Sequence, residues 1–221
     1  MTMVDHRVGS DRLLAVEQAI EAFTEGGFVI VFDDESRENE GDLMVAAEYT
    51  DEDALKQMLD LTSGVICVAL PDRRAAELRL PQMTEENTGL HDTAFTISVD
   101  LKEGGTTGIS AQERARTVRA LAEPSTAPDD LARPGHIFPI TAAPGGVLQR
   151  DGHTEAAVDL SLLAGLSGVT TMCEIVNPDW SMARFDDLSR LSASRLIPLI
   201  SVRDVAAYRL ARAAHRVSPT G

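Results

Sequence analysis

FVIVFDDESRENEGDLMVAA, residues Phe28 to Ala47, places two short apolar runs on either side of a strongly acidic segment. The runs Phe28–Phe32 and Leu43–Ala47 have the length and composition of buried β-strands. Between them, Asp33–Asp42 holds six carboxylates and one arginine within ten residues. Charge runs are usually solvated loops, but clustered carboxylates repel one another unless a cation lies among them. The segment is therefore either a surface loop or a site where one or two carboxylates and substrate oxygens hold Mg²⁺.

Strand and helix patterns alternate along the rest of the chain. This alternation predicts one α/β (α+β) domain over residues 1–213, with a mixed β-sheet and helices packed on its faces, followed by a flexible tail at 214–221. Pro139 suggests that its strand lies at an edge of the sheet. Further strands are expected at Val65–Leu70, Ala94–Val99, His136–Ile140, Val169–Val176 and Leu196–Ile200. Helices are expected after a cap at Ser10 and Asp11, and at Asp51–Leu61, Arg114–Ala122, Thr154–Leu166, Asp186–Ser194 and Ser201–Ala213.

The composition excludes several classes of protein. The formal net charge of −15 disfavours a nucleic-acid partner, because an acidic surface repels phosphate backbones. The longest run without charge, Pro134–Gln149, has 16 residues and three prolines, so we expect no membrane span. Two cysteines and no secretory signal pattern predict a cytoplasmic protein. The acidic, lysine-poor composition is also what adaptation to high salt would produce.

A second candidate site opens the apolar helix near residue 154. Arg150, Asp151, Gly152, His153 and Thr154 precede it or start it. Free N–H groups and the helix dipole attract anions at such a position, Arg150 adds a guanidinium, and Gly152 permits close approach of a ligand to the backbone. The simpler alternative is a threonine cap beside an incidental arginine.

Two further residues could carry acid–base chemistry. Glu174 lies in an apolar strand, where burial raises the pKa of a carboxyl group toward useful values, although a structural ion pair would explain it equally well. His136 follows the turn Arg133–Gly135. Only Lys56 and Lys102 could form a Schiff base, and neither lies in a promising segment, so carbonyl chemistry would depend on a metal.

Taken together, these segments resemble the 3,4-dihydroxy-2-butanone-4-phosphate synthase family of riboflavin biosynthesis. The resemblance runs in order from about residue 10 to residue 212. Its motifs are Asp33–Glu35 with Arg37–Asp42, Ser63-Gly64 with Cys67, Thr106–Ser110, Arg133–His136, Gly145–Leu148, Gly152–Ala156, Cys173-Glu174, Met182–Arg184 and Ala207–Arg209.

The resemblance implies a lyase that converts D-ribulose 5-phosphate to L-3,4-dihydroxy-2-butanone 4-phosphate and formate with Mg²⁺ or Mn²⁺. It also implies a homodimer with sites near the subunit interface. Glu38 and His153 match the family's metal ligands, and His136 and Glu174 match its catalytic residues. The matched substrate contacts are Arg37, Glu38, Asp42, Arg150, Asp151, Gly152, His153, Thr154 and Glu174.

Two segments depart from the family pattern. Trp180 stands where a glycine is usual, and a turn that needs a positive φ would be strained by it. Leu90 and His91 occupy a segment that often holds a tyrosine. Two alternatives therefore stand beside the synthase: a metal-dependent aldolase or isomerase of sugar phosphates, and a diverged metal- or phosphate-binding regulator.

Overall fold

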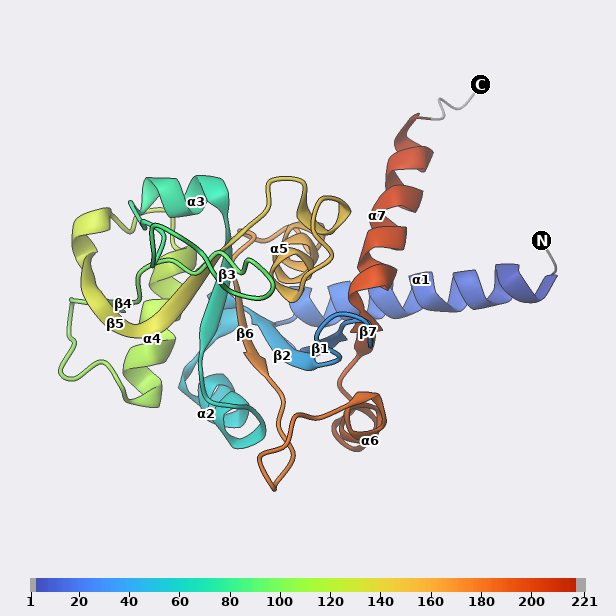
Figure 1. The fold of residues 1–221 in the computed structure, drawn as a ribbon, viewed down its shortest axis with the longest axis horizontal. Coiled ribbons are helices and arrows are strands. Elements are labelled where there is room, and N and C mark those ends of the chain that lie inside the picture. Colours follow the sequence, from blue (N-terminus) through green and yellow to red (C-terminus); the bar gives the residue numbers. More distant parts are fainter. Residues whose placement is uncertain (1–2, 218–221) are drawn as a thin grey trace.

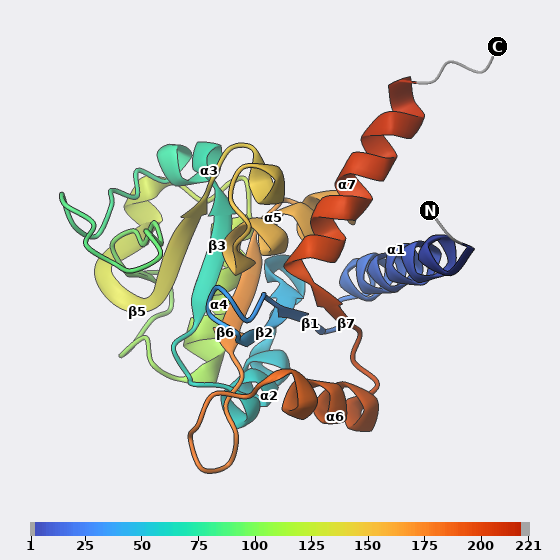
Figure 2. The same cartoon turned by 45° about the vertical axis from the view of Figure 1, so that its right-hand side comes forward.

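The computed structural model describes residues 3–217, which form one seven-stranded sheet with helices on both faces (Figures 1 and 2). The helices of this range are α1 (Met3–Thr24), α2 (Glu52–Leu61), α3 (Asp72–Glu77), α4 (Ala111–Ala122), α5 (His153–Leu163), α6 (Phe185–Arg195) and α7 (Val202–Val217). The strands are β1 (Val29–Phe32), β2 (Gly41–Ala46), β3 (Cys67–Pro71), β4 (Val99–Leu101), β5 (Leu131–Ala142), β6 (Thr170–Glu174) and β7 (Leu199–Ser201).

The sheet is mixed, as the alternating sequence pattern predicts. Its strand order is β4-β5-β3-β6-β2-β1-β7. Strands β1 and β7, and β3 and β5, pair in parallel, whereas β1–β2, β2–β6, β3–β6 and β4–β5 pair antiparallel. The end of β1, the start of β2 and the end of β6 therefore lie side by side, where these strands reach the same end of the sheet.

Apolar side chains cover both faces of the sheet and form two cores. One core joins Leu55 of α2, Val118 of α4 and Leu188 of α6 to one face. The other joins Phe23 of α1 and Leu160 of α5 to the opposite face, together with the start of α7. The first part of α1 and the last part of α7 extend beyond the sheet (Figure 1). None of the helices within residues 3–217 has the length and apolar character that crossing a bilayer demands.

Short-range side-chain bonds set several helix ends. The Ser110 hydroxyl accepts a hydrogen bond from the Glu113 N–H at the start of α4, and the Glu113 carboxylate accepts one from the Ser110 hydroxyl. Asp51 caps α2 in the same way, through the Ala54 N–H. These bonds satisfy N–H groups that a first helical turn leaves without a partner.

Several expectations about local structure are wrong. Helix α1 begins at Met3 and runs through the cap predicted at Ser10 and Asp11. Helix α7 continues to Val217, beyond the end predicted at Ala213, and residues 218–221 lie outside the described residues.

The expectations around Pro139 also fail. Strand β5 lies between β4 and β3 instead of at an edge. The strand expected at Ala94–Val99 reduces to two isolated bridges, Phe95 with Ile140 and Thr96 with Gln82, and β4 begins only at Val99. Pro139 has no N–H and cannot donate a hydrogen bond to this segment. It contributes only its carbonyl, which accepts the Thr96 N–H.

Candidate active site

A small cavity lies where the acidic segment meets the start of α5 and the ends of β2 and β6. Its volume is about 90 Å³. It gathers seven of the site residues proposed from sequence, and Cys67, Thr93, Phe95, Ile140 and Met172 complete its lining. The seven are Arg37, Glu38, Asp42, Arg150, His153, Thr154 and Glu174.

Asp33 folds the acidic segment into a defined loop. Its Oδ1 accepts the Glu40 N–H at 2.9 Å, and its Oδ2 accepts the Glu38 N–H and the Arg37 Nη1–H, each at 3.0 Å. Burial opposes ionisation of Asp33, but the backbone hydrogen bonds, His153 and Arg37 together hold its pKa below the usual value. The loop is thus an organised structure and not a solvated charge run.

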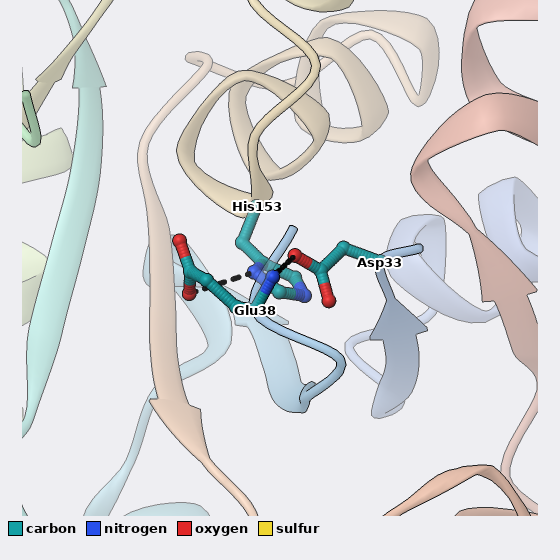
Figure 3. Close-up of side chains that lie close together, drawn as sticks. All are labelled: Asp33, Glu38 and His153. Atoms are coloured by element: carbon teal, nitrogen blue, oxygen red, sulfur yellow. Dashed lines mark hydrogen bonds and ion pairs between the residues drawn. The ribbon is translucent and has the colours of Figure 1, made fainter. Parts of the chain in front are cut away.

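Asp33, Glu38 and His153 form a group that could hold a metal ion. One ligand atom of each lies within 4.8 Å of the others, and the three side chains converge from the acidic loop and the start of α5 (Figure 3). His153 is only 5% exposed, and burial lowers its pKa, which favours the neutral imidazole that ligates metals. Its Nδ1 lies 3.8 Å from Glu38 Oε2, and its buried Nε2 has no hydrogen-bond partner among the described residues. This donor set fits a divalent cation.

The sequence interpretation gave Asp33 no role of its own. The available signal was its position directly after β1, because residues that follow a strand at a crowded sheet edge are well placed to contact the site.

Two carboxyl groups face each other across β2 and β6. Asp42 is the cross-strand partner of Glu174. Burial raises the pKa of Asp42 well above its usual value, and the nearby Glu174 and Glu38 charges raise it further. Ser63 Oγ donates a hydrogen bond to Glu174 Oε2 at 2.8 Å. The site therefore places a buried carboxyl group with a raised pKa beside a second carboxyl group that is hydrogen-bonded to Ser63.

The anion-binding features predicted near residue 152 lie at the start of α5. The helix begins at His153, with Gly152 as its N-cap, and Thr154 is buried in its first turn. Arg150 Nη1 lies 2.6 Å from Glu155 Oε2 and points into the same region as the cavity. An added Cβ at Gly152 would overlap this ion pair, so the pair occupies the space beside the Gly152 Cα. Asp151 lines a neighbouring cavity of about 550 Å³ that also contacts Arg37.

His136 lies outside the cavity. Its Nδ1 is 2.7 Å from Asp100 Oδ2, and its backbone N–H donates to Asp100 Oδ1 at 2.9 Å. An added Cβ at Gly108, whose φ is +81°, would overlap Asp100 and His136, so this loop packs closely on the pair. The imidazole remains 42% exposed. Asp100 is a second residue that sequence reasoning did not identify, because nothing in its local pattern pairs it with a distant histidine.

The two departures from the family pattern lie at the surface. Trp180 adopts φ +67° and is 71% exposed, as expected for a bulky residue in a turn that suits glycine. The segment around His91 reaches the site, because the His91 carbonyl accepts a hydrogen bond from Arg150 at 3.0 Å.

Both the sequence and the fold of this chain resemble those of known proteins. The family model of 3,4-dihydroxy-2-butanone 4-phosphate synthase matches residues 17–208. A synthase of that name from Shewanella sediminis is 44% identical over 194 residues, covering 88% of this chain and 89% of its own length. Riboflavin biosynthesis protein RibBA from Salinispora arenicola is 48% identical over 88% of this chain and 46% of its own length. A crystal structure of the synthase with two magnesium ions superposes with a TM-score of 0.85 at 40% identity, covering 87% of this chain and 95% of the other.

Proposed function

This chain belongs to the 3,4-dihydroxy-2-butanone 4-phosphate synthase family, and from that premise we propose how its own residues carry out the reaction. The enzyme is a lyase of riboflavin biosynthesis that converts D-ribulose 5-phosphate to L-3,4-dihydroxy-2-butanone 4-phosphate and formate. The atoms of the two products sum to those of the substrate. The reaction therefore needs neither an oxidant nor a second substrate.

Glu38 and His153 would hold the divalent cation, Mg²⁺ or Mn²⁺, with Asp33 beside them. The supporting observation is the buried His153 Nε2, which has no hydrogen-bond partner within residues 3–217, in a group that also offers two carboxylates. One relative was solved in complex with two magnesium ions. A cation bound here would supply Lewis acidity to the ketone and neighbouring hydroxyl oxygens of the sugar.

Arg150, Thr154 and the first turn of α5 would receive the substrate phosphate. Arg150 and Thr154 both line the cavity, and the first N–H groups of a helix have no partner within the helix. A guanidinium and a helix N-terminus together suit a phosphate group. The remaining proposed substrate contacts are Arg37, Asp42, Asp151 and Gly152.

Asp42 and Glu174 would move the protons. The reaction requires removal of a proton next to the carbonyl carbon, loss of a hydroxyl group as water and later re-addition of water. Glu174, held by the Ser63 hydroxyl, would accept a proton, and Asp42, whose pKa is raised by burial, would donate one. Each such transfer contributes about 10²–10⁴ in rate.

His136 would act from the second subunit of a homodimer. Its imidazole is partly exposed and does not line the cavity of its own chain. Large exposed apolar side chains occur on segments next to these residues, where Leu90 precedes His91, Val65 lies two residues after Ser63 and Ile109 follows Gly108. A second copy of the chain covering these residues would bury them and present His136 to the neighbouring cavity.

We place the enzyme in the cytoplasm. Cys67 and Cys173 are both free and buried, which is typical of a protein in a reducing compartment. The proposed substrate and product are phosphorylated intermediates of metabolism, which belong to the same compartment.

Formate release tests the assignment. The purified chain with D-ribulose 5-phosphate and Mg²⁺ should release one formate per substrate, and EDTA should stop the release. Glu38→Gln should lower the rate by about 10²-fold or more, whereas Glu35→Gln should leave it unchanged, because Glu35 is exposed in the same loop. Carbon NMR of the product distinguishes the synthase from an aldolase or isomerase, since only the synthase separates one carbon as formate. Wild-type protein that binds Mg²⁺ and substrate without producing formate would refute the assignment.

A further inference from the structure

Glu155 is a buried carboxylate in the first turn of α5. Its residue is 1% exposed. Oε1 accepts the Ala143 N–H at 2.9 Å, and Oε2 lies 2.6 Å from Arg150 Nη1. A buried charge requires partners of this kind, since burial removes it from water. Glu155 thus joins both ends of the loop between β5 and α5.

Arg150 is held from a second direction. Its Nη2 donates to the His91 carbonyl at 3.0 Å and approaches Thr93 Oγ1 at 3.4 Å. These contacts and the Glu155 pair orient the planar guanidinium, because its N–H groups have a fixed geometry. Its Nε–H and second Nη1–H make no hydrogen bond within the described part of the chain, and they remain available to phosphate oxygens.

Gly152 provides an independent observation on the same pair. An added Cβ at this position would overlap Arg150 Nη1 and lie 2.6 Å from Glu155 Oε2. The φ of Gly152 is −108°, which any residue can adopt. The glycine is therefore required by the ion pair that crosses the helix start, and not by the backbone conformation.

We propose that Glu155 is a positioning residue for the reaction, which holds the Arg150 guanidinium in the orientation that receives the substrate phosphate. The proposal rests on the proposed function, in which Arg150 contacts that phosphate. One carboxylate oxygen fixes the loop backbone at Ala143 while the other fixes the guanidinium. The position of the loop and the direction of Arg150 are therefore coupled through a single side chain.

Glu155→Gln should disrupt this coupling. A glutamine has one acceptor oxygen for two donors, so either Ala143 or Arg150 loses its partner. We expect the dissociation constant for inorganic phosphate and the KM for D-ribulose 5-phosphate each to rise about tenfold or more. The kcat should change by less than about threefold, because the proton-transfer groups Asp42 and Glu174 are untouched.

Calorimetry with inorganic phosphate and formate kinetics, both on the full-length Mg²⁺-loaded enzyme, test the proposal. The variants are Glu155→Gln, Arg150→Ala and the double variant, with Glu17→Gln as a control at an exposed glutamate of α1. If Glu155 acts through Arg150, Glu155→Gln has no further effect on phosphate binding in the Arg150→Ala background. Equal weakening in both backgrounds would overturn the proposal.

Gly152→Ala keeps the test decisive if Glu155→Gln does not fold. The new methyl group occupies the space of the ion pair, so this variant should reproduce the rise in KM and in the phosphate dissociation constant. Phosphate binding at the wild-type level in a folded Glu155→Gln or Gly152→Ala variant would overturn the proposal. Wild-type enzyme that binds phosphate but releases no formate would instead refute the proposed reaction, and the phosphate measurements would still decide the role of Glu155.

Discussion

Asp42 of β2 is paired directly with Glu174 of β6 in the adjacent antiparallel strand. The pair lies at the end of the sheet from which the acidic loop extends. Burial and the neighbouring negative charges raise the pKa of Asp42 well above its usual value, while the Ser63 hydroxyl donates a hydrogen bond to Glu174. These different surroundings support the proposed division of roles, in which Asp42 donates a proton and Glu174 accepts one. The difference arises from their surroundings and not from residue type.

Asp42→Asn should abolish the proton donor while preserving the shape of the site. We expect formate release to fall about 10²–10⁴-fold.

The stability of the wild-type protein should respond to pH in the opposite way to an ordinary ion pair. The folded-state pKa of Asp42 exceeds its unfolded-state value, so wild-type stability is fully present below the unfolded pKa and declines as pH rises through the folded pKa.

Urea unfolding of the metal-free proteins between pH 4 and 8 measures this effect. Asp42→Asn should lack the part of the decline that Asp42 causes, whereas Asp60→Asn, at an exposed position, should retain it. Identical pH profiles for wild type and Asp42→Asn would show that Asp42 is ionised in the folded protein.

Metal binding should stabilise the folded protein through Glu38. At a Mg²⁺ concentration of about 100 times the dissociation constant, linkage predicts a gain of about 2.7 kcal/mol. For a chain of this size, that gain corresponds to a rise in Tm of several degrees. Glu38→Gln should reduce the rise, and Glu35→Gln should not, in thermal melts with Mg²⁺ and with EDTA. A full Mg²⁺ response in Glu38→Gln would place the ion elsewhere.

Ser63→Ala should impair the reaction through Glu174. The substitution removes the hydrogen bond from Ser63 Oγ that orients the Glu174 carboxyl group. Loss of such a charge-assisted hydrogen bond corresponds to a factor of about 10–100 in rate. We expect kcat to fall by about this factor with little change in KM. Ser63→Thr, which retains the hydroxyl, should recover part of the rate. An unaltered kcat in Ser63→Ala would mean that Glu174 needs no such support.

Mixed dimers should reveal whether His136 acts across the subunit interface. Glu38→Ala and His136→Ala homodimers should each be inactive. When the two chains are unfolded and refolded together in equal amounts, half of the dimers carry one of each, and each mixed dimer has one intact composite site if the two residues come from different subunits. About a quarter of the wild-type formate activity should then return. No recovery would assign both residues to the same chain.

Trp180→Gly should stabilise the protein. An L-residue in the left-handed region is disfavoured by about 1–2 kcal/mol, and glycine loses about 0.5–1 kcal/mol through the greater freedom of its unfolded chain. The net gain in the free energy of unfolding should therefore be about 0.5–1 kcal/mol, measured by urea denaturation. Trp180→Ala retains the unfavourable φ and should show no gain. A less stable glycine variant would mean that the contacts of the indole outweigh the backbone strain.

Local sequence predicts much of this fold because many elements depend on near neighbours. The capping pair Ser110–Glu113 and the strand from Val29 to Phe32 follow from side chains within a few residues of one another. The prediction fails where a distant partner decides. Pro139 belongs to an interior strand because β4 and β3 pair with β5 from both sides, and Ala94–Val99 loses its ladder because it faces that proline.

By itself, the sequence determined the residue types of the site, the acidic loop between two strands and the helix that begins near His153, since these depend on short-range periodicity and composition. The tertiary structure alone decided which of these groups meet. Strand register sets Asp42 against Glu174, helix packing brings His153 to Glu38, and the Arg150–Glu155 pair takes the space beside Gly152. Such contacts join segments that lie far apart in the chain or fold back across the start of a helix. They are selected by burial and by pairing geometry, and a local sequence pattern contains neither.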